Sequence, residues 1–238
     1  MGLVFEGIPV ELTAELKKVN KIDCFVETGT NKGNTAAWAA KIFEKVFTIE
    51  LSPVYVRLAG QKLRKYDNVE LLEGDSAVML DEVLKTNSGK RCFFWLDAHY
   101  CGKETGGFGE KAPVLEELKK IMATPENHCI LIDDARFFNA PLSTQRGEYP
   151  DILTLASVID SSRYRLFIVD DCVVILPSDA ENIAAIHKYV WKYDFLRARK
   201  TFSFYWYALK TGNFKGIAVA FLLLLKLYKY KDKSSADY

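Results

Sequence analysis

Residues 23–35 of the chain read DCFVETGTNKGNT, and the rest of the sequence follows the pattern that they begin. Asp23–Glu27 is short and largely apolar, which is typical of a buried strand. Gly29 permits a tight turn with close backbone approach, and we expect Gly33 to pack against the sheet where the next helix begins. The stretch therefore predicts a strand, a glycine turn and a helix from about Asn34.

The same alternation of short apolar runs and longer helical stretches continues along the chain. Further expected strands are Val46–Glu50, Val69–Leu72, Arg91–Leu96, Cys129–Ile132, Arg165–Val169 and Cys172–Leu176. Expected helices are Pro9–Val19, Asn34–Phe43, Pro53–Lys65, Ser76–Leu84, Pro113–Met122 and Ile152–Ile159. This order implies right-handed crossovers and a mostly parallel sheet, and the last two strands are close enough to pair as a hairpin. We therefore predict an α/β fold with a Rossmann-like, doubly wound, seven-stranded sheet, one antiparallel strand and a helical C-terminal appendage.

Charge is unevenly distributed along the chain. The 238 residues carry a net charge of +1, which gives no global case for nucleic-acid binding. From Ala185 onward the net charge is +8, against −7 for residues 1–184. Such asymmetry indicates a basic appendage with an anionic partner, although a solvated basic tail gives the same count. With the change of composition after about Ser178, it predicts a main domain of residues 1–178 and an appendage of residues 179–238.

The cysteines indicate a reducing compartment. Four of the five, Cys24, Cys92, Cys129 and Cys172, fall inside apolar runs, where cysteine acts as a small hydrophobe. Met1–Glu11 lacks the basic and apolar regions of a secretory signal. We therefore expect a cytoplasmic protein, with peripheral membrane contact as an addition that the appendage would provide.

Acidic residues end the first three predicted strands, at the edge where open α/β sheets bind ligands. Glu27 ends the first strand, where it suits an ammonium group and would repel a pyrophosphate. Glu50 ends the second strand, where a carboxylate can accept both hydroxyls of a ribose. Asp75 follows the third strand and can accept an adenine amino group. The first turn also lacks the Gly-Lys-Ser/Thr of a P-loop.

A second group of acids follows the fourth and fifth predicted strands. Asp97 ends the fourth, and Asp133 and Asp134 end the fifth. Three close carboxylates repel one another unless a cation lies between them, and oxygen ligands suit Mg²⁺ or Mn²⁺. A helix N-cap is the alternative role for the Asp-Asp pair. His99, at the same edge, is a candidate general base, with metal ligation or a structural role as its alternatives.

From its first to its last predicted strand, the chain resembles class I S-adenosylmethionine-dependent methyltransferases. The resemblance implies that Glu27, Gly29 and Gly33 line the methionine part of the cofactor. It also implies that Glu50 holds the ribose and that Asp75 lies beside the adenine. Neighbouring residues complete the expected cofactor site: Thr28, Thr30, Thr35 and Ser76.

The segments LDAHY (residues 96–100) and LIDDAR (residues 131–136) resemble metal-dependent sugar O-methyltransferases of the macrolide-sugar and rhamnosyl types. Catechol-type O-methyltransferases are a more distant likeness. The resemblance implies that Asp97, Asp133 and Asp134 bind Mg²⁺, with His99 as the catalytic base beside Asp97. It further implies methyl transfer to a hydroxyl of a sugar or glycan.

Two segments are candidate gates over the substrate. Residues 101–111 (CGKETGGFGEK) hold four of the chain's 14 glycines, and residues 137–150 follow the acids of the fifth strand. Glycine-rich loops can act as lids, although many are simply flexible surface. The substrate contacts predicted in and beside these segments are Tyr100, Phe108, Arg136, Arg146 and Tyr149.

The appendage interleaves aromatic and basic residues over 188–215 and continues with an apolar run at 216–225. That run is too short to span a bilayer, which needs about 20 residues. Its composition fits a helix lying in a membrane interface, a dimer contact or a helical hairpin packed on the protein's own core. No known nucleic-acid-binding module is recognisable in it.

These observations predict an S-adenosylmethionine-dependent O-methyltransferase that acts with a divalent metal on a hydroxyl, expected on a sugar or glycan. Two alternatives stay open. A nicotinamide-dependent oxidoreductase predicts a tighter G-x-G-x-x-G turn than this chain has. A non-catalytic, membrane-associated binding protein on the same fold predicts lipid binding through the appendage.

Overall fold

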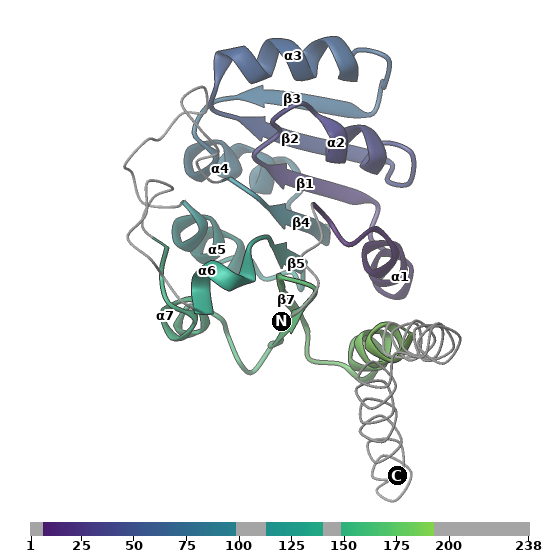
Figure 1. Cartoon of the computed structure of the whole chain (residues 1–238), viewed down its shortest axis with the longest axis vertical. Helices are drawn as coiled ribbons and strands as arrows, with labels where there is room; N and C mark the ends of the chain where they lie inside the picture. The colour runs from purple at the N-terminus through teal and green to yellow at the C-terminus, as the bar shows by residue number, and fades with distance from the viewer. Residues whose placement is uncertain (1–6, 99–112, 140–148, 193–238) are drawn as a thin grey trace, which may run out of the picture. The chain divides into compact units, whose positions relative to one another are not determined.

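The computed structural model describes residues 7–98, 113–139 and 149–192. The chain divides into two compact units, Met1–Ala185 and Ile186–Tyr238, and the first unit holds all the labelled helices and strands (Figure 1). Residues 180–192 are helical, whereas residues 193–238 of the predicted appendage, with the apolar run, lie outside the described residues. Within the described part, no helix has both the length and the apolar character needed to cross a membrane.

Seven strands form one sheet in the order β3-β2-β1-β4-β5-β7-β6. They are β1 (Cys24–Thr28), β2 (Lys45–Glu50), β3 (Val69–Glu73), β4 (Cys92–Leu96), β5 (Cys129–Ile132), β6 (Tyr164–Val169) and β7 (Cys172–Pro177). Strands β1 to β5 run parallel, and β7 is antiparallel to both β5 and β6. This arrangement confirms the predicted seven-stranded, mostly parallel sheet with one antiparallel strand.

The hairpin between β6 and β7 is also confirmed. Val169 pairs with Cys172 across a two-residue turn formed by Asp170 and Asp171. Both aspartates have positive φ angles, 51° and 66°. Tight hairpin turns favour this left-handed conformation, and Asp tolerates it better than most residues.

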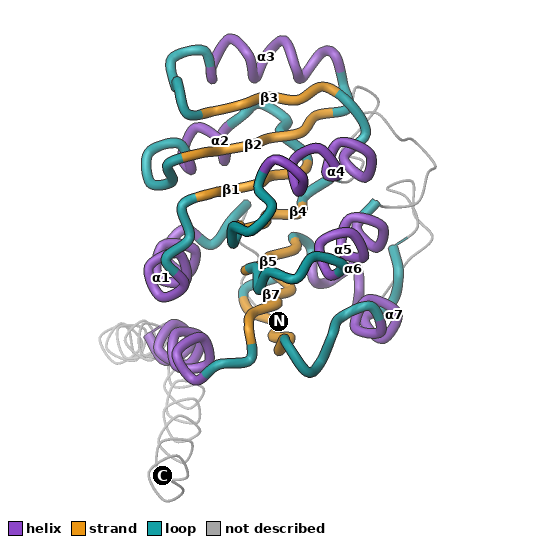
Figure 2. The backbone as a smooth tube through the Cα atoms, turned by 180° about the vertical axis from the view of Figure 1, so that it is seen from behind, coloured by secondary structure: helices purple, strands orange, loops and turns teal. Residues whose placement is uncertain are grey.

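Helices cover both faces of the sheet (Figures 1 and 2). They are α1 (Val10–Asn20), α2 (Asn34–Ala39), α3 (Pro53–Leu63), α4 (Ser76–Thr86), α5 (Val114–Met122), α6 (Ala135–Asn139) and α7 (Ile152–Ser157). Helix α2 lies in front of the sheet in Figure 1, and α4 lies in front of it in Figure 2. Pro53 occupies the first turn of α3, and aspartates cap α4 and α7, so local sequence fixes where these helices begin.

Helix α6 corrects one prediction. We expected residues 137–150 to form a loop, but Ala135–Asn139 is helical. Five residues are too few to show helical periodicity in a sequence. The backbone of this helix is instead tied to the β6–β7 turn, because the Ala135 N–H donates to the Asp171 carbonyl at 2.7 Å.

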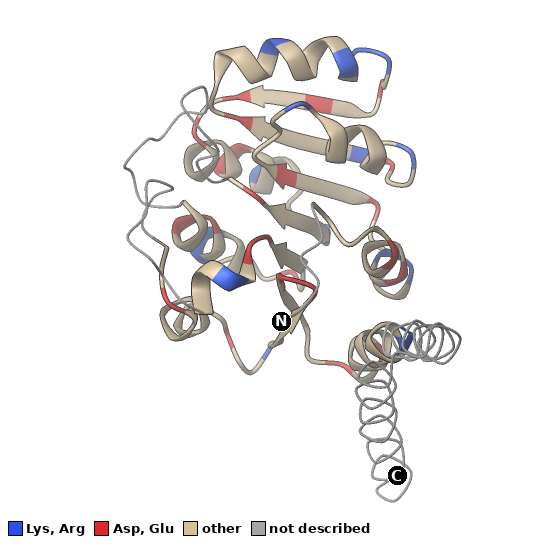
Figure 3. Ribbon diagram, in the orientation of Figure 1, with Lys and Arg blue, Asp and Glu red and all other residues tan. Residues whose placement is uncertain are grey.

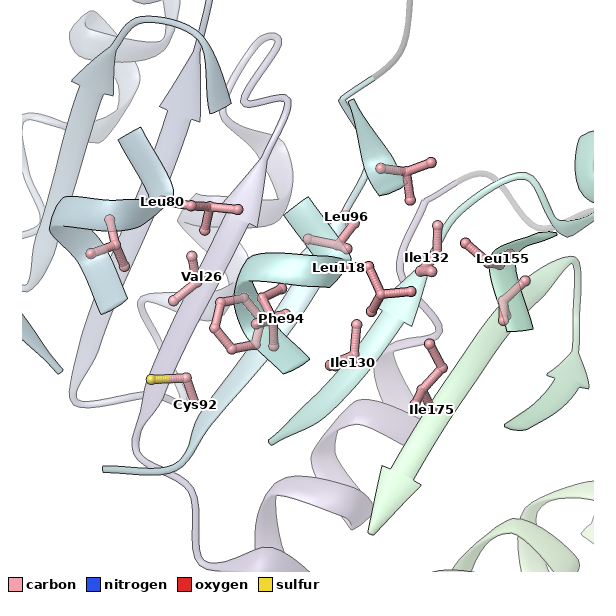
Figure 4. Close-up of a cluster of buried hydrophobic side chains, with 14 of the residues drawn as sticks. Val26, Leu80, Cys92, Phe94, Leu96, Leu118, Ile130, Ile132, Leu155 and Ile175 are labelled. Carbon is pink, nitrogen blue, oxygen red and sulfur yellow. The ribbon is translucent and has the colours of Figure 1, made fainter. Parts of the chain in front are cut away.

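The hydrophobic core has two layers, one on each face of the sheet. Val26 of β1, Phe94 of β4 and Ile130 of β5 belong to the cluster that includes Leu80 of α4 and Leu118 of α5 (Figure 4). Successive strand residues point to opposite faces, so the neighbouring strand residues form a second layer beneath α1 and α2. In that layer the rings of Phe25, Phe43 and Phe93 pack at centroid distances of 5.0 to 6.0 Å. The central strands are buried along their length, which explains their near-continuous apolar sequence.

Candidate active site

The glycine turn after β1 is held against the tips of the neighbouring strands. Gly29 has a φ of 85°, and a Cβ there would lie 2.4 Å from the carbonyl oxygen of Asp97. The Gly29 N–H donates to the Ile49 carbonyl of β2 at 2.9 Å. The predicted close approach is therefore real, and its partner is the backbone at the end of β4.

Gly33 lies at the start of α2 and close to α3. Its φ of 70° precedes α2 as predicted, but a Cβ there would meet Leu63 and Ala59 at 3.2 to 3.3 Å. Both of these residues belong to α3. The glycine therefore permits α2 to begin close to α3.

Glu27, at the end of β1, is a buried carboxyl group with hydroxyl partners. It is 1% exposed and accepts a hydrogen bond from Thr48 Oγ1 at 2.6 Å, and Thr48 in turn lies 2.6 Å from Thr30 Oγ1. Burial raises the pKa of Glu27 to about 8, with repulsion from Asp97 and Glu50 adding to the shift. The hydroxyls of Thr48 and Thr35 act in the opposite direction. Below pH 8 the ligand-free protein therefore carries mostly neutral Glu27, which a bound cation would ionise.

Glu50, at the end of β2, connects the first turn to the second. Its two carboxylate oxygens accept the N–H of Asn31 at 2.7 Å and the N–H of Ser52 at 2.9 Å. Each oxygen keeps a lone pair for a further donor. The carboxylate is 7% exposed, so its position is fixed before any ligand arrives.

Asp75 and Ser76 lie where β3 leads into α4. Asp75 is the N-cap of α4 and accepts the Ala77 N–H at 2.7 Å, which is a structural role that the sequence also permits. Ser76 is buried as the first residue of that helix. An adenine contact by Asp75 stays a prediction. The side chain is exposed and its capping bond leaves other lone pairs, so it can accept a further donor.

A small pocket opens beyond β4 and β5, and we call it the acidic pocket. Three acidic residues, Asp97, Glu117 and Asp133, line it together with the aromatic residues Phe138 and Tyr149. The aliphatic part of its lining is Leu96, Ala98, Val114 and Ile132. Two of the predicted metal ligands, Asp97 and Asp133, therefore line one pocket, and Tyr149, a predicted substrate contact, lines it too.

Asp134 does not line the acidic pocket. Its φ is 59°, and its carboxylate lies 2.6 Å from the Arg136 guanidinium. Arg136 also pairs with Asp171 of the β6–β7 turn, whose carboxylate accepts the Arg136 N–H at 3.0 Å. The guanidinium expected to contact substrate is thus paired with two carboxylates of its own chain.

The predicted set of three metal ligands is accordingly split. In the part of the chain that the structure describes, no three His, Cys, Asp or Glu side chains are grouped closely enough to hold one ion. His99, Tyr100, Phe108 and Arg146 lie outside the described residues. The base and three of the substrate contacts therefore stay predictions.

Glu117, on α5, was not predicted from the sequence. It is 1% exposed, and burial raises its pKa to about 7, with repulsion from Asp75 and Asp97 opposing the effect of the Ser76 and Thr28 hydroxyls. Thr28, predicted to contact the cofactor, therefore has its hydroxyl near Glu117. The sequence did contain a signal, because Val114, Glu117, Leu118 and Ile121 form one buried helical face on which only Glu117 is charged.

The donor set at this edge of the sheet suits a cation. Acidic side chains colour the ends of β1, β2 and β3 red in Figure 3, and Glu27, Glu50 and Glu73 supply them. A pyrophosphate would meet buried carboxyl groups there, whereas an ammonium or sulfonium group would relieve their repulsion. The residues present therefore fit the sulfonium and amino groups of S-adenosylmethionine better than the phosphates of a dinucleotide.

Three solved structures that are similar to this chain are each described as methyltransferases. The O-methyltransferase TomG from Streptomyces achromogenes, in complex with SAM, is 13% identical, with 74% of this chain and 82% of that chain covered and a TM-score of 0.50. A putative caffeoyl-CoA O-methyltransferase from Staphylococcus aureus is 16% identical, with 74% and 86% covered and a TM-score of 0.52. A putative methyltransferase from Streptococcus mutans, in complex with SAH, is 15% identical, with 73% and 99% covered and a TM-score of 0.51.

The chain has the class I methyltransferase fold. Comparison of the sequence with models of protein families and with curated proteins gives no match. At 13 to 16% identity the solved structures establish the fold and leave the reaction to be argued from the site. In this class I methyltransferase fold, the first turn, Glu50 and the acidic pocket occupy the carboxyl edge of the sheet, where such sheets bind ligands.

Proposed function

We propose that the chain binds S-adenosylmethionine at the carboxyl edge of β1 and β2 and transfers its methyl group to an acceptor held in the acidic pocket. One observation supports this most. Glu27 and Glu50 are buried, preorganised carboxyl groups on either side of the Gly29 turn, on a fold whose solved examples include complexes described with SAM and SAH.

Each residue has a separate part in cofactor binding. The unused lone pairs of Glu50 would accept the ribose hydroxyls, and ionised Glu27 would neutralise a cationic group of the cofactor. Because Gly29 has no Cβ, the cofactor would be able to lie close to the backbone of the turn after β1. When bound, S-adenosylmethionine supplies an electrophilic methyl group on a positively charged sulfur.

The acceptor would be a hydroxyl, as the sequence predicts, and the acidic pocket would orient it. A hydroxyl nucleophile must lose a proton, and His99 remains the predicted base for that step. A sugar or glycan as acceptor rests on the resemblance of the LDAHY and LIDDAR segments. The walls of Phe138 and Tyr149 suit the apolar face of such a ring.

Metal assistance is a separate part of the proposal. Asp97 and Asp133 still line one pocket and could share a Mg²⁺ or Mn²⁺ ion with substrate oxygens. The pairing of Asp134 with Arg136 removes the third predicted ligand. Assays with added Mg²⁺ and with EDTA would decide it, because a metal-assisted reaction stops in EDTA.

The other candidate functions have less support. A nicotinamide dinucleotide would place a pyrophosphate beside Glu27 and Glu50, where buried carboxyl groups oppose it. A membrane-associated binding role depends on the appendage, of which residues 193–238 lie outside the described residues.

The test is formation of S-adenosylhomocysteine from S-adenosylmethionine with a panel of sugar and other hydroxyl acceptors. We expect turnover by the wild-type chain and at least about tenfold loss in Glu50→Ala, since two charge-assisted hydrogen bonds are removed. Glu82→Ala, an exposed position on α4, is the matched control and should behave as wild type. Turnover that is unchanged in Glu50→Ala would contradict the proposed cofactor site.

A further inference from the structure

Charge in the first unit is divided between the two edges of its sheet. The segments that lead into β1, β2, β3 and β4 are residues 18–23, 40–45, 64–68 and 87–91, and together they hold eight Lys or Arg against three acids. Figure 3 shows blue segments beside the starts of β2 and β3 and red at the far ends of these strands. We call these four segments the basic edge, and one strand length, about 16 Å, separates it from the proposed cofactor site.

Hydrogen bonds join the segments of the basic edge into one surface. The Lys45 N–H donates to the Asp23 carbonyl at 3.1 Å, which joins the segments before β1 and β2. The side-chain amide of Asn68 donates to the Ala40 carbonyl at 2.9 Å, which joins the segments before β2 and β3. Strands β1 and β4 are neighbours in the sheet, so the segment before β4 lies beside the one before β1.

The basic side chains of this surface are accessible to a partner. Among them, six are exposed and form no salt bridge with another described residue: Lys21, Lys41, Arg64, Lys65, Lys90 and Arg91. One of the three acids, Asp23, is already paired with Lys17 at 2.8 Å. The surface therefore carries an excess of positive charge that attracts an anionic partner.

The appendage begins at the basic edge. Asn182, near the start of the helix of residues 180–192, exchanges side-chain hydrogen bonds with Asn20 at 2.8 and 3.1 Å. Both side chains are buried, and Asn20 is the last residue of α1 and part of the basic edge. The chain therefore leaves the first unit beside its basic surface.

The sequence that begins there favours a lipid surface as the anionic partner. From Ala185 onward the net charge is +8, and an apolar run follows at 216–225. Val190 and Trp191, on the described helix, are 38% and 48% exposed. An aliphatic run has no partner on a nucleic acid, whereas basic, Trp and aliphatic side chains together suit the interface of an anionic membrane.

A second copy of the chain fits the basic edge less well. The acids at its opposite edge include Glu27 and Glu50, which are 1% and 7% exposed and cannot reach the lysines of another molecule. The appendage of a second copy is itself basic, so the surface would repel it.

We propose that the basic edge docks the first unit on an anionic membrane surface. Each Lys or Arg near such a surface adds to the attraction, and salt weakens it. The carboxyl edge lies at the other end of the same strands, so an acceptor would reach the proposed reaction site from the aqueous side. The docking itself does not depend on the proposed reaction.

Co-sedimentation of the intact chain with lipid vesicles tests the proposal. Vesicles of phosphatidylcholine alone, and of phosphatidylcholine with about 30% phosphatidylserine, differ in surface charge and share an apolar interior. The double variant Lys21→Gln/Lys41→Gln removes two exposed charges from neighbouring segments of the basic edge. Lys32→Gln/Arg57→Gln removes two exposed charges outside it and is the matched control.

We expect the wild type and the control to bind the anionic vesicles at least about tenfold more tightly than the neutral ones in about 0.1 M salt. Lys21→Gln/Lys41→Gln should bind the anionic vesicles at least about tenfold more weakly than wild type. Its thermal midpoint should be unchanged, because both side chains are exposed and form no salt bridge with another described residue.

Three results would overturn the proposal. If the two double variants bound the anionic vesicles equally, the appendage alone would account for docking. If the wild type bound both kinds of vesicle equally or bound neither, the basic edge would have no role at a membrane. Binding of a single-stranded oligonucleotide that weakens in Lys21→Gln/Lys41→Gln, without vesicle binding, would assign the surface to a nucleic acid.

Discussion

Ionisation of Glu27 should make the affinity for S-adenosylmethionine depend on pH. Its pKa is about 8 because burial and the charges of Asp97 and Glu50 outweigh the hydroxyls of Thr48 and Thr35. A cationic cofactor binds the ionised form, so binding at lower pH must first remove a proton. We expect the affinity for S-adenosylmethionine to rise by about tenfold between pH 6 and 7.5.

Calorimetric titrations at several pH values would measure this dependence. Glu27→Gln cannot ionise, so its affinity should be lower and nearly independent of pH over the same interval. A wild-type affinity that falls as the pH rises from 6 would mean that the cofactor prefers neutral Glu27, and the assigned role would be wrong.

Gly29 offers a test of the turn itself, with Gly89 as its control. Both have strongly positive φ angles, 85° and 80°, but a Cβ at Gly89 would meet nothing within 4 Å. Gly89→Ala should therefore lower the free energy of unfolding only by the conformational cost of a positive φ, about 1 kcal/mol. Gly29→Ala adds a clash with the backbone of Asp97, so we expect a loss of about 3 kcal/mol or more in urea unfolding. Equal losses would show that the turn relaxes away from β4.

For single residues, the sequence predicted the position of those that directly end a strand. Glu27, Glu50 and Asp97 are of this kind, and the topology alone brings them to one edge. Asp134 has a positive φ, which no local sequence pattern predicts. Glu117 reaches the pocket through the packing of α5, and a helical pattern shows only that its face is buried.

At the scale of elements, the β6–β7 turn holds α6 in place. Asp171 accepts the N–H of Arg136 and pairs with its guanidinium, while the Asp171 carbonyl accepts the Ala135 N–H. Asp171→Asn keeps a residue that tolerates positive φ but removes the charge. We expect faster hydrogen exchange in residues 135–139 by several-fold, with little change in Asp170→Asn, the other residue of the turn. Protection that is unchanged in Asp171→Asn would show that α6 is held by other contacts.

His128 joins α5, β4 and β5 and should make the fold acid-sensitive. Its Nδ1 accepts the Cys92 N–H at 3.0 Å, and its Nε2 lies 2.9 Å from Thr124 Oγ1, so the ring is neutral with the proton on Nε2. Burial lowers its pKa to about 4, and Arg163 and Arg91 add to the shift against the opposing charge of Glu126.

The unfolded chain therefore takes up a proton at His128 near pH 6.5, whereas the folded chain does so only near pH 4. Stability from this group is present above pH 6.5 and is lost as the pH falls to 4, by roughly 3 kcal/mol. His128→Gln should be less stable than wild type at pH 7 and should lack this part of the decline. His187→Gln, at an exposed position, should keep it. If the free energy of unfolding fell equally with pH in wild type and His128→Gln across this range, the account would be contradicted.

The elements themselves were largely predictable, with no end displaced by more than four residues. Strand β5 begins and ends as predicted, because Cys129–Ile132 is a continuous apolar run between polar residues. Helix α2 ends at Ala39, four residues before its expected end, since the following residues turn towards β2. Helix α6 could not be predicted, because tertiary hydrogen bonds hold it.

For the whole first unit, strand order follows from alternation and from the handedness of crossovers. The sheet order places the ends of β1, β2, β4 and β5 side by side, which is why residues far apart in sequence form one site. The sequence predicted this convergence, but it could not divide the acids between cofactor, acceptor and ion pairs. That division depends on side-chain direction, as the pairing of Asp134 with Arg136 shows.

The central claim is that this edge of the sheet binds S-adenosylmethionine, and calorimetric titration of the intact chain at pH 7.5 tests it most directly. The account predicts micromolar binding by the wild type and by Glu82→Ala, with at least about tenfold weaker binding by a folded Glu50→Ala. No binding by well-folded wild-type protein, or equal binding by Glu50→Ala, would contradict it.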